Sequence, residues 1–555
     1  MKSNEPTKTK KAMKTMKKFL SMAALALVGA VMTGCSGDDD FTSEPQQPVN
    51  TDNVEILTTT ISMDAGEQTR ALTSAGVKTF AAGDQLALVY KNTSNQTVKA
   101  VSTALPSGSY GSSATFTFEL VNADKTKNVT YIYPASMAKN DGTVNYDALN
   151  SQNGTLASLA SNLDCCTKSA AWDGTSLPTV TLDNQFAICA FTIKNNNGSS
   201  DLTSNVTGLT VSVGTNTYTV SRSKAAGPIY VAIRPTSSAS INYTATVGTD
   251  YYTKTVTGKT YTAGKIYQLG LRMESPFING LVTVNSSNKK VRFSKGNLQY
   301  QASTNTWRFA ANQYSYVGDG GKTCGNVSGS NNESASSSYS GWIDLFGWGT
   351  SGYNHGATCY QPWSTSTTNS YYRAYGNASY DLSSSTGQAD WGYNTISNGG
   401  TGWRTLTKDE WVYILKYREG PTINGYSPSL CMKTKVGDVY GLIIFADNYT
   451  HPSDVSIDTY DINYFIRQWA AIRNTYSLAD WAKMEAAGAI FLPISNVRRG
   501  TTLVDGGDRT GCYWSATHVG DDQANGLYFS NSKVEYQGVY DRSEGYAVRL
   551  VKNVQ

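Results

Sequence analysis

The sequence has few charged residues and very few histidines. Only 16% of the 555 residues are Asp, Glu, Lys or Arg, and the 3 histidines are His355, His451 and His518. They are far apart in the chain, and none belongs to a metal-ligand spacing. No nucleophile and base occur at a usable spacing either. The sequence therefore predicts no catalytic residue, no metal, no cofactor and no enzymatic activity.

A strong net charge is also missing. The formal net charge of +4 comes from 46 Lys and Arg against 42 Asp and Glu. Seven of these lysines and one of these glutamates precede Cys35, so the remainder has 39 basic and 41 acidic residues and a net charge of about −2. A basic surface is what nucleic-acid binding would require, so we do not expect nucleic acid as a partner.

Long apolar runs are scarce, and the most prominent one stands near the start of the chain. It extends over 19–32, follows seven lysines, and is too short for a comfortable bilayer crossing. Small residues at Thr33 and Gly34 then precede Cys35. This order predicts a secretion signal over residues 1–34.

The same stretch resembles the signal of bacterial lipoproteins, in which the cysteine is acylated and becomes the new N-terminus. The resemblance implies that Cys35 carries the lipid. The acidic residues 36–40 look like the export tag that sends lipoproteins of Bacteroides-like bacteria to the outer face of the outer membrane. The alternative is an ordinary signal peptide that contains a cysteine.

Cysteines are few for a chain of this length. Without Cys35, seven of the eight remain, an odd number that cannot all pair within one chain. In an oxidising compartment, Cys324 with Cys359 and Cys431 with Cys512 are possible disulfides, but the connectivity stays open. We take buried thiols as the default for these residues.

Residues 35–53 are polar and contain prolines, which indicates a flexible tether. From 54 to 273, short β-branched and aromatic runs alternate with turn residues, and residues 84–90, 114–120 and 129–133 have apolar side chains at period two. Residues 186–193 are nearly all apolar and predict a strand at the centre of a β-sandwich. We expect no helix of comparable quality in this region.

Short motifs in this region resemble the fimbrillin family of Bacteroides-type pilus proteins, namely residues 69–71, 80–84, 131–134 and 263–269. The resemblance implies two consecutive β-sandwiches over 54–273. It also implies that a protease cuts after Arg70, so that the chain begins at Ala71 and a strand of a neighbouring subunit fills the vacated groove. The alternative is that Arg70 lies in an uncut surface loop.

A proline-containing linker over 274–279 separates a second region, 280–555, in which helices are predicted beside strands. Strands are expected at 291–293, 297–300 and 306–309. Thr407 and Glu410 form the pattern of a capping box. Another helix is predicted from Ser477 to Ala487, ending before Gly488. The fold class is therefore mainly β, with tandem sandwiches followed by an α+β domain.

Several segments of the second region resemble the C-type-lectin-like fold, in the branch that holds the Fibrobacter major paralogous domain and the formylglycine-generating enzyme. They are residues 403–411, 491–493, 511–517, 526–529 and 545–551. The closely spaced cysteine pair of that enzyme is missing, and so is the ligand set of calcium-dependent lectins. Asp505 and Asp508 could hold a cation through their carboxylate oxygens. The alternative, which is more common for such sequences, is a solvated turn.

Aromatic residues crowd into a Gly, Ser and Thr-rich stretch over 342–372. Most should fill the core, but a minority on loops of a rigid scaffold could bind sugars or proteins. We select Trp348 and Trp363 as ligand-binding residues.

The predicted function is that of a cell-surface lipoprotein acting as a fimbrial tip or minor subunit and adhesin. The alternative is an outer-surface glycan-binding lipoprotein that assists polysaccharide capture outside any pilus. The expected partners are the outer membrane through the lipid anchor, other pilin subunits, and host or bacterial glycans or proteins.

Overall fold

The computed structural model describes residues 53–63, 79–163, 165–196, 198–353, 360–423, 425, 431–461, 468–504 and 509–554. Cys35, Arg70 and Ala71 lie outside these ranges, as do His355, Cys359, Asp505 and Asp508. Within them, no helix is long and apolar enough to cross a membrane. The described chain is mainly β, with many small sheets and few helices, as the sequence predicts.

The first strands form one seven-stranded sheet, in the order β3-β2-β5-β7-β8-β1-β4. Thr103 N–H, just after β3, donates to Thr117 O in β4 at 3.0 Å, so the sheet curls round its core and its two edges meet. Buried aromatic residues such as Phe116 and Tyr131 fill this core. The strands are β1 (Val54–Met63), β2 (Ala87–Lys91), β3 (Thr97–Val101), β4 (Ser113–Val121), β5 (Val129–Tyr133), β7 (Cys166–Ala170) and β8 (Val180–Asn184).

The next strands form two sheets around a second core. One has the order β14-β13-β10-β11-β6 and the other the order β12-β9-β15. Strand β9 is almost entirely buried between its two neighbours, which confirms the strand predicted over 186–193. The strands are β6 (Ser151–Gln152), β9 (Ala187–Asn195), β10 (Val206–Val213), β11 (Asn216–Ser221), β12 (Ile229–Ile233), β13 (Thr236–Val247), β14 (Asp250–Tyr261) and β15 (Ile266–Met273).

A short helix, α1 (Leu156–Asn162), corrects the expectation that no helix interrupts this region. Its N-cap is Thr155, whose side-chain oxygen accepts from Ser158 N–H at 3.2 Å. A helix of seven residues is too short to show a clear period in the sequence. Its cap and the burial of Leu159 hold it in place.

The strands from residue 282 onward form five small sheets. Strand β30 lies between β17 and β20, so the first and last parts of this region are paired. The strands are β16 (Val282–Thr283), β17 (Lys290–Phe293), β18 (Leu298–Gln301), β19 (Thr306–Phe309), β20 (Arg404–Thr405), β21 (Cys431–Val436), β22 (Val439–Phe445), β23 (Thr475–Tyr476), β24 (Ala489–Pro493), β25 (Val497–Arg499), β26 (Thr502–Val504), β27 (Gly511–Val519), β28 (Gln523–Phe529), β29 (Val534–Asp541) and β30 (Leu550–Asn553).

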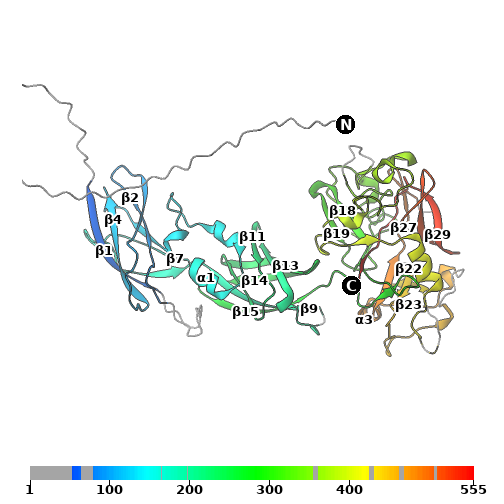
Figure 1. Cartoon of the computed structure of the whole chain (residues 1–555), viewed down its shortest axis with the longest axis horizontal. Helices are drawn as coiled ribbons and strands as arrows, with labels where there is room; N and C mark the ends of the chain where they lie inside the picture. The colour runs from blue at the N-terminus through cyan, green and yellow to red at the C-terminus, as the bar shows by residue number, and fades with distance from the viewer. Residues whose placement is uncertain are drawn as a thin grey trace, which may run out of the picture. The chain divides into compact units, whose positions relative to one another are not determined.

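Two helices of this region form where the sequence predicts them, and the second, α3, is labelled in Figure 1. Helix α2 (Lys408–Val412) begins with the complete capping box of Thr407 and Glu410. Helix α3 (Leu478–Ala486) begins at the N-cap Ser477 and buries Trp481 and Met484. Gly488 follows it with a φ of +105°, a conformation that favours glycine.

The cysteines of the described chain do not form the two possible disulfides. Cys512 is a free and fully buried thiol, so Cys431 and Cys512 are not joined. Cys324 is also a free thiol, so it makes no bridge to Cys359. Burial raises the pKa of Cys512 well above its ordinary value, which keeps the thiol protonated. The prediction that the cysteines are buried thiols is confirmed for Cys512.

Candidate functional site

Strand β1 is the first described strand of the chain and is paired along both of its edges. It runs antiparallel to β4, with pairs from Val54 with Val121 to Ser62 with Ser113. On its other edge it runs parallel to β8, from Ile61 with Val180 to Met63 with Leu182. Figure 1 shows β1 and β4 side by side. Loss of β1 would leave β4 and β8 with open edges.

Alternate side chains of β1 point into the core of the curled sheet. Ile61 is fully buried, and Thr59 and Met63 are each 5% exposed. Thr59 Oγ1 also donates to Pro178 O at 2.9 Å. Ile56 points outward and is 72% exposed. Burying an aliphatic side chain contributes about 1.5–3 kcal/mol, so β1 is a substantial part of this core.

The predicted processing site follows β1 in the sequence. Met63 is the last residue of the strand, and Thr79 is the next described residue. Arg70 and Ala71 fall between them, outside the described residues. A cut after Arg70 would break the covalent connection between β1 and the later strands of its sheet, and β1 would then be held only by its pairing with β4 and β8.

The expectation that Trp348 is an exposed ligand-binding residue is wrong. Its ring is fully buried, and its Nε1 donates to Ser515 O at 2.9 Å. The guanidinium carbon of Arg542, also fully buried, lies 4.6 Å from the centre of the Trp348 ring. Trp363 is partly buried and packs against the same core. Trp348 is therefore a core residue, although the sequence around it has no regular period.

The largest exposed aromatic side chains lie elsewhere. Among the described residues, four tyrosines have more than half of their surface exposed, namely Tyr371, Tyr393, Tyr417 and Tyr460. Tyr460 lies beside a polar pocket, where the Arg473 guanidinium carbon is 4.6 Å from its ring centre. These residues do not line a common cavity.

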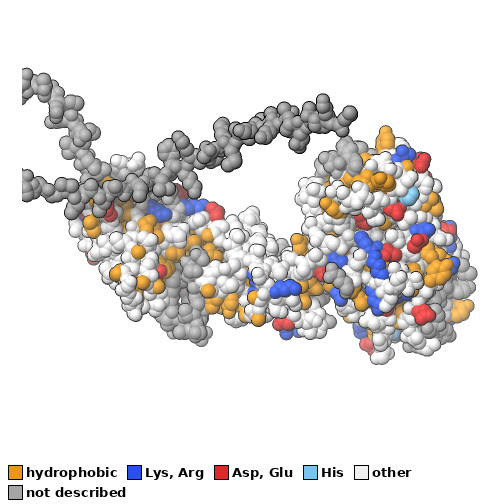
Figure 2. Space-filling view, in the orientation of Figure 1, with side chains coloured by type: hydrophobic (Ala, Val, Ile, Leu, Met, Phe, Trp, Pro, Cys, Tyr) orange, Lys and Arg blue, Asp and Glu red, His pale blue; other side chains and the backbone are white. Residues whose placement is uncertain are grey.

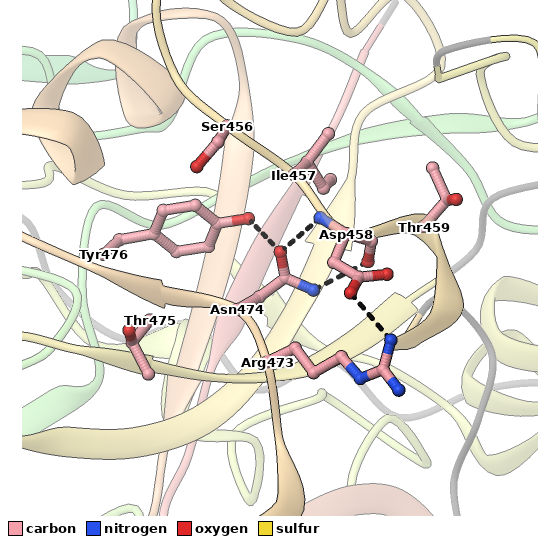
Figure 3. A pocket seen from close by; sticks show the side chains of 8 residues that line it. All are labelled: Ser456, Ile457, Asp458, Thr459, Arg473, Asn474, Thr475 and Tyr476. Carbon is pink, nitrogen blue, oxygen red and sulfur yellow. Dashed lines mark hydrogen bonds and ion pairs between the residues drawn. The ribbon is translucent and has the colours of Figure 1, made fainter.

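The polar pocket has a volume of about 450 Å³ and lies between residues 456–459 and 473–476 (Figure 3). Asn474 makes most of the hydrogen bonds between these residues. The Asn474 side-chain oxygen accepts from Asp458 N–H at 2.8 Å and from Tyr476 Oη at 3.1 Å. Its Nδ2 donates to Asp458 O at 2.8 Å. Arg473 Nη1 lies 3.1 Å from Asp458 Oδ2.

These bonds lie inside the pocket wall, as the dashed lines in Figure 3 show. The amide of Asn474 therefore serves to hold the segment around Asp458 against β23. A buried amide whose bonds are made within the protein stabilises a loop and has little left to offer a ligand. We interpret this pocket as structural.

A second groove has a different chemistry. It has a volume of about 350 Å³ and lies between the β25–β26 hairpin and the sheet β27-β28-β29. Val497 and Val504 face each other across the hairpin and line one side. The other lining residues are Arg499, Thr510, Gln523, Tyr528, Val539, Tyr540, Asp541, Glu544 and Tyr546.

The aromatic residues of this groove form a series that begins in the core. Trp514 and Tyr546 are buried and stacked, with ring centres 4.4 Å apart. Tyr540 meets Tyr546 at 5.2 Å, and Tyr528 stacks on Tyr540 at 6.1 Å. Tyr528 and Tyr540 are partly exposed. The series therefore presents a rigid aromatic surface that is anchored from within.

Charged groups stand beside this surface. Arg499 Nε donates to Glu544 Oε1 at 2.8 Å, and Tyr546 Oη donates to Glu544 Oε2 at 2.6 Å. Hydrogen bonding to Glu544 raises the pKa of Arg499, which keeps this arginine charged. The Arg499 side chain is 64% exposed, whereas the Glu544 side chain is only 11% exposed. A fixed arginine head thus lies at the edge of the groove.

Sequence reasoning used residues 526–529 and 545–551 as fold motifs and did not select this groove. The groove depends on the register of β28 and β29, which shifts between Gly526 and Tyr528. Such an irregularity is invisible in the sequence. The available signal was the recurrence of tyrosine in both strands, at Tyr528 and Tyr540.

Charges of both signs are spread over the C-terminal region. On the face drawn in Figure 2, Lys and Arg side chains are interspersed with Asp and Glu side chains there. Within the described ranges, no group of three or more His, Cys, Asp or Glu side chains could hold a metal ion. His518 is paired with Asp381, with Nδ1 2.7 Å from Oδ1, and His451 bonds Tyr449 and Val455.

Comparisons with known proteins give distant similarities. No protein-family profile and no curated protein matches the sequence. A fimbrial assembly protein from Parabacteroides distasonis aligns over 44% of this chain and 96% of its own, with 8% identity and a TM-score of 0.25. A fimbrial protein from Bacteroides ovatus aligns over 90% and 99%, with 11% identity and a TM-score of 0.21.

A streptococcal ancillary pilin aligns over 44% of this chain and 77% of its own, with 10% identity and a TM-score of 0.16. The chain thus has a distant structural similarity to fimbrial proteins. At such low identities and TM-scores, the function has to be argued from this chain's own residues. The resemblance of 280–555 to the C-type-lectin-like fold stays a prediction.

Proposed function

We propose that this chain is a surface-anchored adhesin that enters a pilus as a tip or minor subunit. Strand β1 carries the proposal, because it is the first described strand and lies between β8 and β4 in its sheet. Its removal would expose two strand edges and the buried side chains of Phe116, Phe118 and Leu120. Such a slot accepts an extended strand through main-chain hydrogen bonds, with alternate side chains giving specificity.

Lipidation at Cys35 and a cut between Arg70 and Ala71 complete the proposal. The lipid would hold the uncut chain on the outer membrane, and the cut would release it with an open slot. Strand β30 is held between β17 and β20, so it is not available to fill the slot of another subunit. This supports a tip or minor position over a place in the shaft.

The test is the N-terminus of the protein in isolated surface filaments. Mass spectrometry should find a first residue at Ala71 in filaments, and an acylated Cys35 in the membrane fraction. A Cys35→Ala variant should take up no labelled fatty acid, while an Arg70→Ala variant should keep its lipid and remain in the membrane. Filament-bound chains that retain residues 35–70 would contradict release by cleavage.

The second candidate is an outer-surface glycan-binding lipoprotein that never enters a pilus. The groove beside Tyr528 and Tyr540 supports this candidate, because a ligand-binding groove could serve a chain that stays on the membrane and needs no filament. The two candidates differ in location. Immunogold labelling with antibody to residues 280–555 would mark filament ends in the first case and only the cell envelope in the second.

A further inference from the structure

We propose that the groove between the β25–β26 hairpin and strands β28 and β29 binds one ring of a neutral saccharide. The inference rests on the adhesin role proposed above and specifies its ligand class. The volume of about 350 Å³ is at the small end of the range for ligand sites. It matches a single pyranose ring with the rest of a glycan extending into solvent.

The aromatic side of the groove suits the apolar face of a sugar. A pyranose presents a patch of C–H groups, which pack on an aromatic ring, and a rim of hydroxyls, which require hydrogen bonds. Tyr540 packs over Gly526 and Gly538, where the absence of side chains makes room for its ring. Tyr546 packs against Tyr540 on the core side, and Trp514 stacks on Tyr546. The stacking surface is therefore formed before any ligand binds.

The polar side supplies donors and acceptors for the rim. Arg499 is fixed by Glu544, and no described residue accepts a hydrogen bond from Arg499 Nη1. Gln523 Nε2 donates to Asp541 Oδ1 at 3.2 Å, so an amide and a carboxylate stand together at the groove. Planar groups of this kind can each meet neighbouring hydroxyls of one sugar ring.

The balance of charge favours a neutral sugar. Glu544 already compensates the one arginine of the groove, and Asp541 adds a second carboxylate. Lys533, 5.2 Å from the centre of the Tyr528 ring, is paired with Glu535, so an acidic sugar would add a negative charge to a groove whose positive groups are already compensated, which is unfavourable. The polar pocket in Figure 3 has a different character, because the amide of Asn474 is bonded to Asp458 and Tyr476 within the pocket wall.

The test is binding of simple glycosides to the detergent-solubilised full chain. Methyl glycosides of glucose, galactose and mannose, with glucuronate as the acidic comparator, are titrated by calorimetry and saturation-transfer NMR. At least one neutral glycoside should bind with a Kd near 1 mM, because one ring buries little area and association carries an entropic cost. Glucuronate should bind more weakly.

Four variants locate the site. Tyr540→Ala should weaken binding about ten-fold or more through the lost stacking surface, while Tyr540→Phe should retain it. Val504→Trp should block binding by filling the groove from the hairpin side, without removing any ring. Tyr460→Ala is the matched control, because it removes an exposed tyrosine beside the other pocket.

Binding that survives both Tyr540→Ala and Val504→Trp would overturn the assignment, as would tighter binding of glucuronate or no binding of any glycoside. Failure here is separable from failure of the proposed function. Filaments that still carry the chain, and cells that still adhere with the Tyr540→Ala chain, would leave the adhesin role in place and remove only this groove from it.

Discussion

The two halves of the described chain use strands in different ways. In the N-terminal half, long strands form extended sheets, and a core side chain such as Ile61 reaches its place through the alternation of a single strand. In the C-terminal half, many strands have two to four residues, and the core combines tryptophans with buried arginines such as Arg498 and Arg549. The first design builds a core from whole strands that lie side by side; the second ties distant segments together.

The buried arginines explain how the irregular half is held. Arg542 Nη2 donates to Ala378 O at 2.7 Å and Arg498 Nη1 donates to Gly500 O at 2.6 Å. One guanidinium can satisfy several loop carbonyls, which replaces part of the hydrogen bonding that long strands would provide. A half built in this way has much of its surface on loops and short hairpins, while the other half consists mainly of extended strands.

The largest effect is expected from a charge at Ile61, which should destabilise the N-terminal half and leave the C-terminal half folded. Ile61→Asp should cost more than about 4 kcal/mol and unfold the first sheet, because it buries an unpaired carboxylate. Limited proteolysis with mass spectrometry should find early cuts between residues 79 and 184, with 280–554 still protected. Ile56→Asp, on the exposed side of the same strand, is the control and should change little.

Removing a buried ring should have the next largest effect, in the other half. Trp348→Ala should lower the free energy of unfolding by about 3–5 kcal/mol, because it leaves a large cavity and an unpaired Ser515 carbonyl. Urea denaturation measures the loss, and hydrogen exchange should confine it to the C-terminal half. Tyr371→Ala, at an exposed ring, should be nearly neutral; equal losses would show that Trp348 is not a core residue.

A smaller effect should depend on pH. Burial raises the pKa of Asp344 from 3.8 to about 6, although Asn332 and the Val317 N–H bond its carboxylate. The folded state therefore holds the proton more tightly than the unfolded state. Stability should fall as pH rises from about 4 to 6, by roughly 3 kcal/mol, and stay at the lower value above that.

Urea titrations of the unmodified chain and of Asp344→Asn, at several pH values, measure this effect. The variant should lose the part of the slope between pH 4 and 6, even if its stability at neutral pH also changes. An identical slope in both proteins would show that Asp344 does not carry the pH dependence.

The smallest effect is chemical labelling of thiols, which should leave both halves folded. Cys324 is partly exposed, whereas Cys189 and Cys512 are fully buried with strongly raised pKa values. Iodoacetamide should therefore modify Cys324 well before these two, as peptide mass spectrometry can follow. Early labelling of Cys512 would mean that the C-terminal core opens more readily than its packing indicates.

Local patterns were the part of the fold that the sequence could predict. Period-two alternation located β4 and β5, and continuous apolar character located β9. The capping box of α2 was found from two residues, because its bonds involve neighbours in the chain. Signals of this kind are local, so they do not depend on the rest of the fold.

What could not be predicted depends on distant contacts. Trp348 lies in a stretch without any period, and it is buried because Ser515 and Arg542 come to it from far along the chain. The groove beside Tyr540 needs a hairpin, a sheet and a shifted register together. Cys35 and Arg70 were selected from motifs, and both lie outside the described residues.

The mixed pairing of β1 has a consequence for polarity. Strands β4 and β8 run in opposite directions, so a replacement strand is antiparallel to one of them and parallel to the other in either direction, and only the direction of β1 restores its long antiparallel register on β4. Every subunit that donates a strand in this direction would therefore have the same orientation relative to the chain that receives it. A contact of this type joins two unlike surfaces, the slot on one chain and the strand of another, so it gives the assembly a direction and does not pair two copies symmetrically.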